Sequence, residues 1–133
     1  MRFFLDNNLS YRLAEALDVL SGAEGHSVVH VSKKYTASAK DVDWIRWLAE
    51  EGGWVIVSGD SRIRKRPRER EIFLAARLTT FFLAPGWINA KFWEQSQLLV
   101  RWWPRIIEQS ALVEQGAVFE IPYRQTGRFT QLR

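Results

Sequence analysis

The segment Met1-Arg-Phe-Phe-Leu-Asp-Asn-Asn-Leu9 decides the fold class of this chain. Its three consecutive apolar residues, 3–5, predict a short strand that is buried on both faces, as in a parallel sheet. Asp6 then places a carboxylate at the carboxyl end of that strand, where ligands bind in open α/β sheets. The alternative is that Asp6 caps the turn and that Asn7 or Asn8 caps the next helix.

Strand and helix patterns alternate along the rest of the chain. We predict strands at residues 2–5, 26–31, 54–57, 81–83 and 117–121, and helices at residues 9–20, 41–51, 67–77 and 89–109. Residues 32–40 are polar and predict an exposed loop, and Pro104 is expected to kink or divide the last helix. This order predicts an α/β fold in which helices cover both faces of a mostly parallel sheet.

The composition is that of a folded domain with anionic partners. The chain has 133 residues, of which 47% are hydrophobic, so one domain with a single core is expected. The domain is predicted to span residues 1–123, followed by a basic, flexible tail at 124–133. Net charge is +4 and the pI is near 9.8, which favours nucleic acid as a partner.

Several classes of protein are disfavoured by the same sequence. The absence of cysteine excludes a disulfide framework and a thiolate metal site. No apolar run reaches the roughly 20 residues of a membrane span. The few apolar residues before Asp6 do not form a signal peptide. We therefore expect a cytoplasmic protein without a membrane partner.

Carboxylates from three distant segments are predicted to meet at one edge of the sheet. Asp6 follows the first strand, and Asp60 follows the third strand in the same way. Asp41 and Asp43 open the helix after the second strand, and in a βα unit that helix starts at the same edge. Each acid taken alone could instead be a cap or a turn residue.

Grouped carboxylates repel one another unless a cation lies between them. Hard carboxylate oxygens suit Mg²⁺ or Mn²⁺, and His26 and His30 are given little weight as ligands. Such an ion can activate water and neutralise the charge that develops on a phosphate. The sequence therefore predicts a divalent-metal site at this edge, with Asp6, Asp60 and either Asp41 or Asp43 as ligands.

A basic segment follows Asp60 directly. Its cationic residues are Arg62, Arg64, Lys65, Arg66, Arg68 and Arg70. A charge run of this kind is usually a solvated face, but this one begins at the edge where the acids are expected. It could therefore hold the phosphates of RNA beside them. Trp102 and Trp103 could stack on bases, but their place in an amphipathic helix favours packing in the core.

Segments in order along almost the whole chain resemble one family. They are Phe4-Leu-Asp-Asn-Asn-Leu9, Gly25-His-Ser-Val-Val-His30, Asp41-Val-Asp-Trp-Ile45, Gly53-Trp-Val-Ile-Val-Ser-Gly-Asp60, Phe81-Phe-Leu-Ala-Pro-Gly-Trp87, Phe92-Trp-Glu94 and Trp102-Trp-Pro-Arg-Ile106. Together they resemble PIN-like domains related to VapC toxins of type II toxin–antitoxin systems. The resemblance implies an α/β/α sandwich, Mg²⁺- or Mn²⁺-dependent ribonuclease activity and, commonly, a cognate antitoxin.

The resemblance also assigns roles to individual residues. Asp6, Asp41 and Asp60 match the family's acids, with Asp43 close behind Asp41 as a further catalytic candidate. Better-known PIN domains use a glutamate near the middle position and often a fourth acid, for which Glu71 is a weak match here. We expect three polar side chains to orient the metal ligands by hydrogen bonds: Asn7, Asn8 and Ser58.

The hypothesis from the sequence is a metal-dependent endoribonuclease that cleaves single-stranded or structured RNA as the toxin of a toxin–antitoxin pair. The RNA backbone would be positioned by Arg62, Arg64, Lys65 and Arg66. A homodimer is left open. The competing hypothesis is a non-catalytic PIN-like module that binds RNA or a protein at the same edge.

Overall fold

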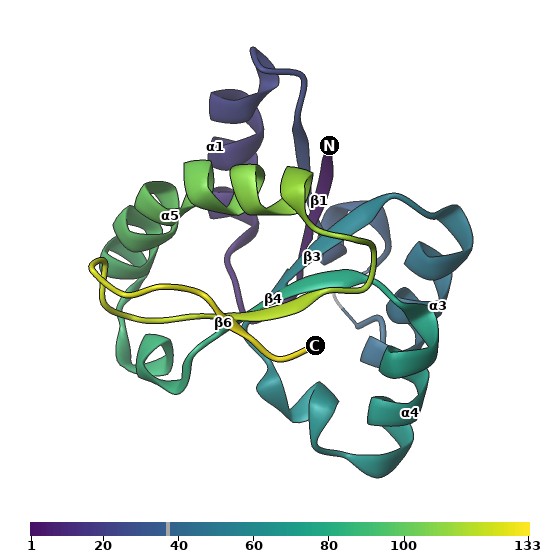
Figure 1. The fold of residues 1–133 in the computed structure, drawn as a ribbon. Helices are drawn as coiled ribbons and strands as arrows, with labels where there is room; N and C mark the ends of the chain where they lie inside the picture. Colours follow the sequence, from purple (N-terminus) through teal and green to yellow (C-terminus); the bar gives the residue numbers. More distant parts are fainter. Residues whose placement is uncertain (37) are drawn as a thin grey trace.

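The computed structural model describes residues 1–36 and 38–133, and all of their side chains except those of Ser61 and Arg64. Within this part of the chain one sheet holds six strands in the order β2-β1-β3-β4-β5-β6 (Figure 1). The strands are β1 (Arg2–Leu5), β2 (Ser27–His30), β3 (Trp54–Ser58), β4 (Thr79–Leu83), β5 (Val118–Ile121) and β6 (Thr130–Gln131). All neighbouring strands are parallel except β5 and β6.

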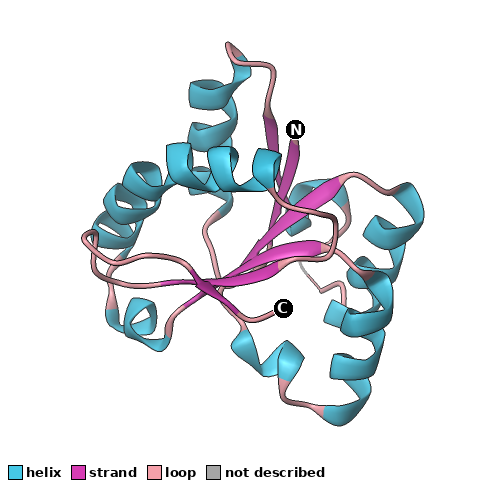
Figure 2. Ribbon diagram, viewed as in Figure 1, coloured by secondary structure: helices cyan, strands magenta, loops and turns pink. Residues whose placement is uncertain are grey.

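The helices lie on both sides of this sheet (Figure 2). They are α1 (Tyr11–Gly22), α2 (Val31–Lys34), α3 (Asp41–Glu51), α4 (Pro67–Ala76) and α5 (Phe92–Leu112), with the short 3₁₀ helices η1 (Ser61–Arg64) and η2 (Pro85–Asn89). Helices α1 and α5 lie on one side, and α3 and α4 on the other (Figure 1). The predicted α/β fold with helices on both faces is confirmed.

The strands are apolar on both faces because each face carries a core. Phe3 and Leu5 of β1 point into the cluster under α1 and α5, where Phe3 packs on Trp103 with ring centroids 5.0 Å apart. Phe4 points the other way, into the cluster under α3 and α4, and packs on Trp44 at 4.9 Å. This period of two is the strand pattern of a sheet buried on both faces.

Two predictions at the ends of β1 and β2 were wrong. The N-cap of α1 is Ser10, whose side chain accepts the N–H of Arg12, rather than Asn8. The segment after β2 also begins with a short helix, α2, where a loop was predicted. The imidazole of His30 caps that helix by accepting the N–H of Ser32 at 3.1 Å. Histidine is an unusual cap, so the sequence offered no clear signal for it.

One prediction near the C-terminus was also wrong. Pro104 does not divide the last helix, since α5 runs through it as one element, with Trp103 and Ile106 buried on either side of the proline. The tail after Tyr123 was expected to be flexible, yet it holds β6, which pairs antiparallel with β5. Phe129 fixes this segment by packing on Trp102 with ring centroids 5.1 Å apart. None of the helices in the described part of the chain has the length and apolarity that a membrane crossing needs.

Candidate functional site

Asp6 is a buried acid at the carboxyl edge of the sheet. It follows the last residue of β1, and only 2% of its surface is exposed. Its Oδ1 accepts the backbone N–H groups of Asn8, at 3.1 Å, and of Gly59, at 3.3 Å. Its Oδ2 accepts the hydroxyl of Ser58, the last residue of β3. These bonds hold the carboxylate between the ends of two neighbouring parallel strands.

The environment of Asp6 disfavours its ionised form. Burial raises the pKa of this carboxyl from 3.8 to about 6, although the hydrogen bonds from Ser58, Gly59 and Asn8 act to lower it. The negative charge of Asp41 also raises this pKa. A buried acid whose pKa is raised in this way, next to a second acid, is typical of functional sites.

Asp60 lies at the same edge, connected to Asp6 through Ser58. The Ser58 hydroxyl donates to Asp6 and accepts the backbone N–H of Asp60 at 3.0 Å. Both carboxylate oxygens of Asp60 are engaged by Arg62: its Nε donates to Oδ1 at 2.9 Å and its Nη2 to Oδ2 at 3.2 Å. Burial acts to raise the pKa of Asp60, but the hydrogen bonds and charge of Arg62 bring it below its usual value.

Asp41 is the third acid at this edge. It opens α3, is partly buried, and its Oδ1 accepts the indole N–H of Trp44 at 3.0 Å. Partial burial raises the pKa of Asp41, and the charge of Asp60 raises it further. Asp41 therefore lies close enough to Asp6 to affect its ionisation, and Asp60 lies close enough to Asp41 to do the same. Asp43 lies in the same first turn of α3, but the negative charge that raises the pKa of Asp6 is that of Asp41.

The chemistry of this donor set suits a hard divalent cation, because three carboxylates from separate segments face one edge. Their arrangement is not that of a formed metal centre. Within the part of the chain that the structure describes, no three His, Cys, Asp or Glu side chains are grouped so that they could hold one ion. The guanidinium of Arg62 instead supplies the positive charge at Asp60.

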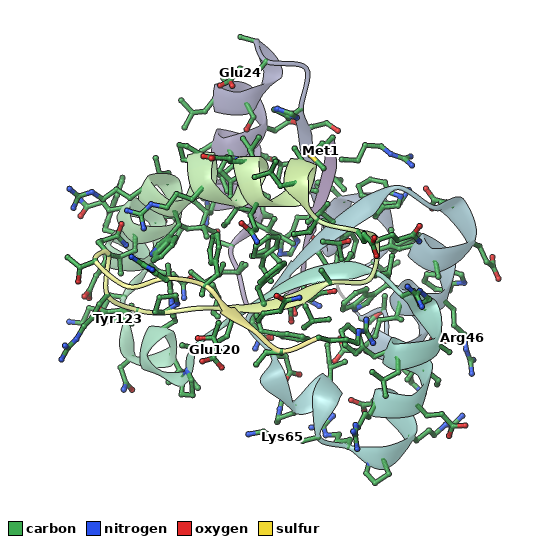
Figure 3. All side chains as sticks on the ribbon, in the orientation of Figure 1. Met1, Glu24, Arg46, Lys65, Glu120 and Tyr123 are labelled. Carbon is green, nitrogen blue, oxygen red and sulfur yellow. The ribbon has the colours of Figure 1, made fainter. Side chains whose placement is uncertain are left out.

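The cationic residues predicted to bind RNA lie just beyond the acids. Arg62 contacts Asp60, and Arg66 pairs with Glu69 at 3.0 Å. Lys65 is exposed and extends away from the fold (Figure 3). The side chain of Arg64 is outside the described part of the structure, so its predicted role is untested.

The remaining polar residues singled out from the sequence have different environments. Ser58 is fully buried between the two acids, and Asn8 contacts Asp6 through its backbone N–H. Asn7 is exposed in the turn after β1. His30 is buried, and its Nε2 lies 2.7 Å from the carbonyl oxygen of Leu9, which fits a structural role.

The sequence interpretation missed Gly59 and a cavity beside it. A Cβ built on Gly59 would lie 2.6 Å from the Cβ of Asn8, so only glycine lets the turn after β1 pack on the end of β3. A cavity of about 450 Å³ adjoins this contact, and η2 and the start of α5 form its other wall. The Ser-Gly-Asp order after a buried strand was the one available signal for Gly59.

Comparison with models of known protein families identifies the family of this chain. The family model described as "PIN like domain" matches residues 1–85, which include β1 to β4 and all four acids predicted for the site. The chain therefore belongs to the PIN-like domain family. Comparisons with curated proteins and with solved structures found no match.

Proposed function

We propose that this protein is an endoribonuclease of the PIN-like class that depends on Mg²⁺ or Mn²⁺. The observation that carries the proposal is the burial of the Asp6 carboxylate at a sheet edge where Asp41 and Asp60 add negative charge. This arrangement disfavours the ionised forms of Asp6 and Asp41, and a bound cation would stabilise them. Membership of the PIN-like family, in which nuclease activity is common, supports the same function.

Asp6, Asp41 and Asp60 would hold the metal, and the ion would supply an activated water and a positive charge for the scissile phosphate. The protein's own part is to fix these carboxylates. Ser58 bonds to both Asp6 and Asp60, and the backbone N–H of Gly59 adds a second constraint on Asp6. Side chains held in this way keep their geometry without reorganising during the reaction.

Arg62 would have a double role in this proposal. Its side chain is 64% exposed, so it can leave Asp60 and bind a phosphate that arrives at the edge. A guanidinium makes paired hydrogen bonds to carboxylate and phosphate alike. RNA binding and release of Asp60 would then occur together, with Lys65 and Arg66 adding charge along the backbone of the RNA.

We further propose that the RNase is the toxin of a type II toxin–antitoxin pair, as in VapC-like proteins. The support is the resemblance of the ordered segments from Phe4 to Trp87 to PIN-like domains related to those toxins. A cognate antitoxin would be the protein partner. Induced expression with and without the neighbouring reading frame tests this, and growth arrest relieved by the neighbour is expected.

A non-catalytic PIN-like module that binds RNA or protein is the second candidate. Two observations favour it. The described residues include no group of three acids able to hold a metal, and Arg62 neutralises the charge of Asp60. In that case Asp6 and Asp60 would serve as turn and cap residues, and Asp60 does cap η1 through the N–H of Arg62.

Cleavage of labelled single-stranded RNA and tRNA with Mn²⁺ or Mg²⁺ separates the two candidates. The wild type should cleave, EDTA should stop the reaction, and Asp6→Asn should abolish it. Glu24→Gln is the matched control, because Glu24 is an exposed acid in the turn after α1 (Figure 3). Binding without cleavage of any RNA, in the presence of either metal, would support the non-catalytic module.

A further inference from the structure

The cavity beside the acidic edge has a mixed lining. Its volume is about 450 Å³, within the usual range for small-ligand sites. One wall is formed by the turn after β1 and the end of β3, and the other by η2 and the first turn of α5. The lining residues that matter here are Asn8, Gly59, Trp87, Ile88, Phe92 and Gln95.

The cavity is directly connected to the buried carboxylate. Asn8 and Gly59 line it, and the backbone N–H groups of these same two residues donate to Asp6. A ligand in the cavity would therefore contact the same turn that holds Asp6. This shared turn places the cavity beside the acidic edge.

The wall formed by η2 and α5 presents apolar surface that the fold does not cover. Ile88 is 85% exposed and Phe92 is 43% exposed. Trp93, 75% exposed, lies beside Phe92 with ring centroids 5.6 Å apart. Behind them Trp87 is buried and rigid, because its indole N–H donates to the carbonyl oxygen of Ile121 at 3.0 Å. Exposed apolar residues grouped around a cavity indicate a binding surface.

We propose that this cavity seats one unpaired base of a single-stranded RNA while the adjoining phosphate lies at the acidic edge. The inference extends the proposed ribonuclease function and depends on it for the placement of the phosphate. Phe92 supplies an aromatic surface for the base, and the side-chain amides of Asn8 and Gln95 supply both donors and acceptors for its edge.

An unpaired base suits these features better than a base in a duplex. Bases inside a duplex are stacked on their neighbours and cannot enter a cavity, whereas a single strand can turn one base outward. Aromatic side chains bind such bases with little dependence on sequence, since every base has a π face. The protein should therefore prefer single-stranded over double-stranded RNA of the same length.

The test measures binding without cleavage, by fluorescence anisotropy in EDTA. The probes are a labelled short oligouridylate and an abasic ribose-phosphate strand of equal length. Phe92→Ala should weaken oligouridylate binding about tenfold, because the base loses its stacking contact with the aromatic ring. It should leave abasic binding unchanged, and Phe92→Trp should retain wild-type affinity. Leu112→Ala removes an apolar side chain, 75% exposed, at the other end of α5 and should change neither.

The proposal would be overturned if the wild type bound the two strands with equal affinity, or if Phe92→Ala weakened the binding of both equally. A protein partner would then be the better explanation of the apolar surface. The cleavage assay keeps this outcome distinct from failure of the ribonuclease function. If Phe92→Ala still cleaves RNA at the full rate, the base-site proposal is rejected and the ribonuclease proposal stands. If binding depends on the base but no RNA is cleaved with either Mg²⁺ or Mn²⁺, the base-site proposal is supported and the ribonuclease proposal is rejected.

Discussion

Asp6→Asn is expected to make the protein more stable at neutral pH. In the unfolded chain this carboxyl loses its proton near pH 3.8, whereas burial in the folded chain raises its pKa to about 6. Between these values the folded state binds more protons than the unfolded state, so the free energy of unfolding falls as the pH rises. The stabilising effect of the protonated form is complete below pH 3.8 and is lost above pH 6.

The pKa difference sets the size of the effect. It corresponds to about 3 kcal/mol of lost stability above pH 6. Asparagine removes this penalty, but its amide group must replace the carboxylate that accepts the hydroxyl of Ser58. An imperfect replacement costs about 1 kcal/mol. We therefore expect Asp6→Asn to raise the free energy of unfolding by roughly 1–3 kcal/mol near neutral pH and to leave it almost unchanged near pH 4.

Urea titrations across this pH range, in EDTA, provide the assay. Asp18→Asn is the matched control, because the Asp18 carboxylate accepts the backbone N–H of Val28 at 2.8 Å and so has a structural role. That substitution should destabilise the fold. A loss of stability in Asp6→Asn at neutral pH, like that of the control, would show that Asp6 is a structural turn residue and would refute the reasoning.

Three further predictions follow from the geometry of the acidic edge. Asp41→Asn should reduce RNA cleavage by more than tenfold, as expected for loss of a metal-binding carboxylate, whereas Asp43→Asn should retain most of it; equal losses would contradict the assignment of Asp41. Arg62→Gln should tighten Mn²⁺ binding by freeing Asp60, and should reduce the salt dependence of RNA binding by about one charge; calorimetry and binding at several salt concentrations measure these. Gly59→Ala would place its Cβ 2.6 Å from that of Asn8, so a loss of roughly 1–3 kcal/mol is expected in urea.

The architecture was predictable because it depends on simple periodicity. Segments such as Phe3 to Leu5 are apolar at every position, which only a sheet covered on both faces explains, and the helix stop at Gly52 was visible in the sequence. The errors arose where distant contacts decide local structure. The C-terminal strand β6 exists because β5 offers it an edge and because Phe129 packs in the core, and neither fact is local.

The candidate site was predictable in outline and less so in detail. Parallel topology alone places Asp6, Asp60 and the start of α3 at one edge, and the structure agrees. The hydrogen bond between Ser58 and Asp6 joins the ends of two strands that are far apart in sequence, so only the fold reveals its geometry. The pairing of Arg62 with Asp60 was hidden because a charge run indicates a basic face and gives no partner.

Calorimetric titration with Mn²⁺ tests the central claim most directly, because the proposed chemistry requires a divalent cation at Asp6, Asp41 and Asp60. The wild type should bind Mn²⁺ with measurable heat. Asp6→Asn and Asp60→Asn should each lose that binding, while Glu24→Gln should keep it. Binding that is absent from the wild type, or unchanged in both aspartate variants, would contradict the account of this edge as a metal-dependent catalytic site.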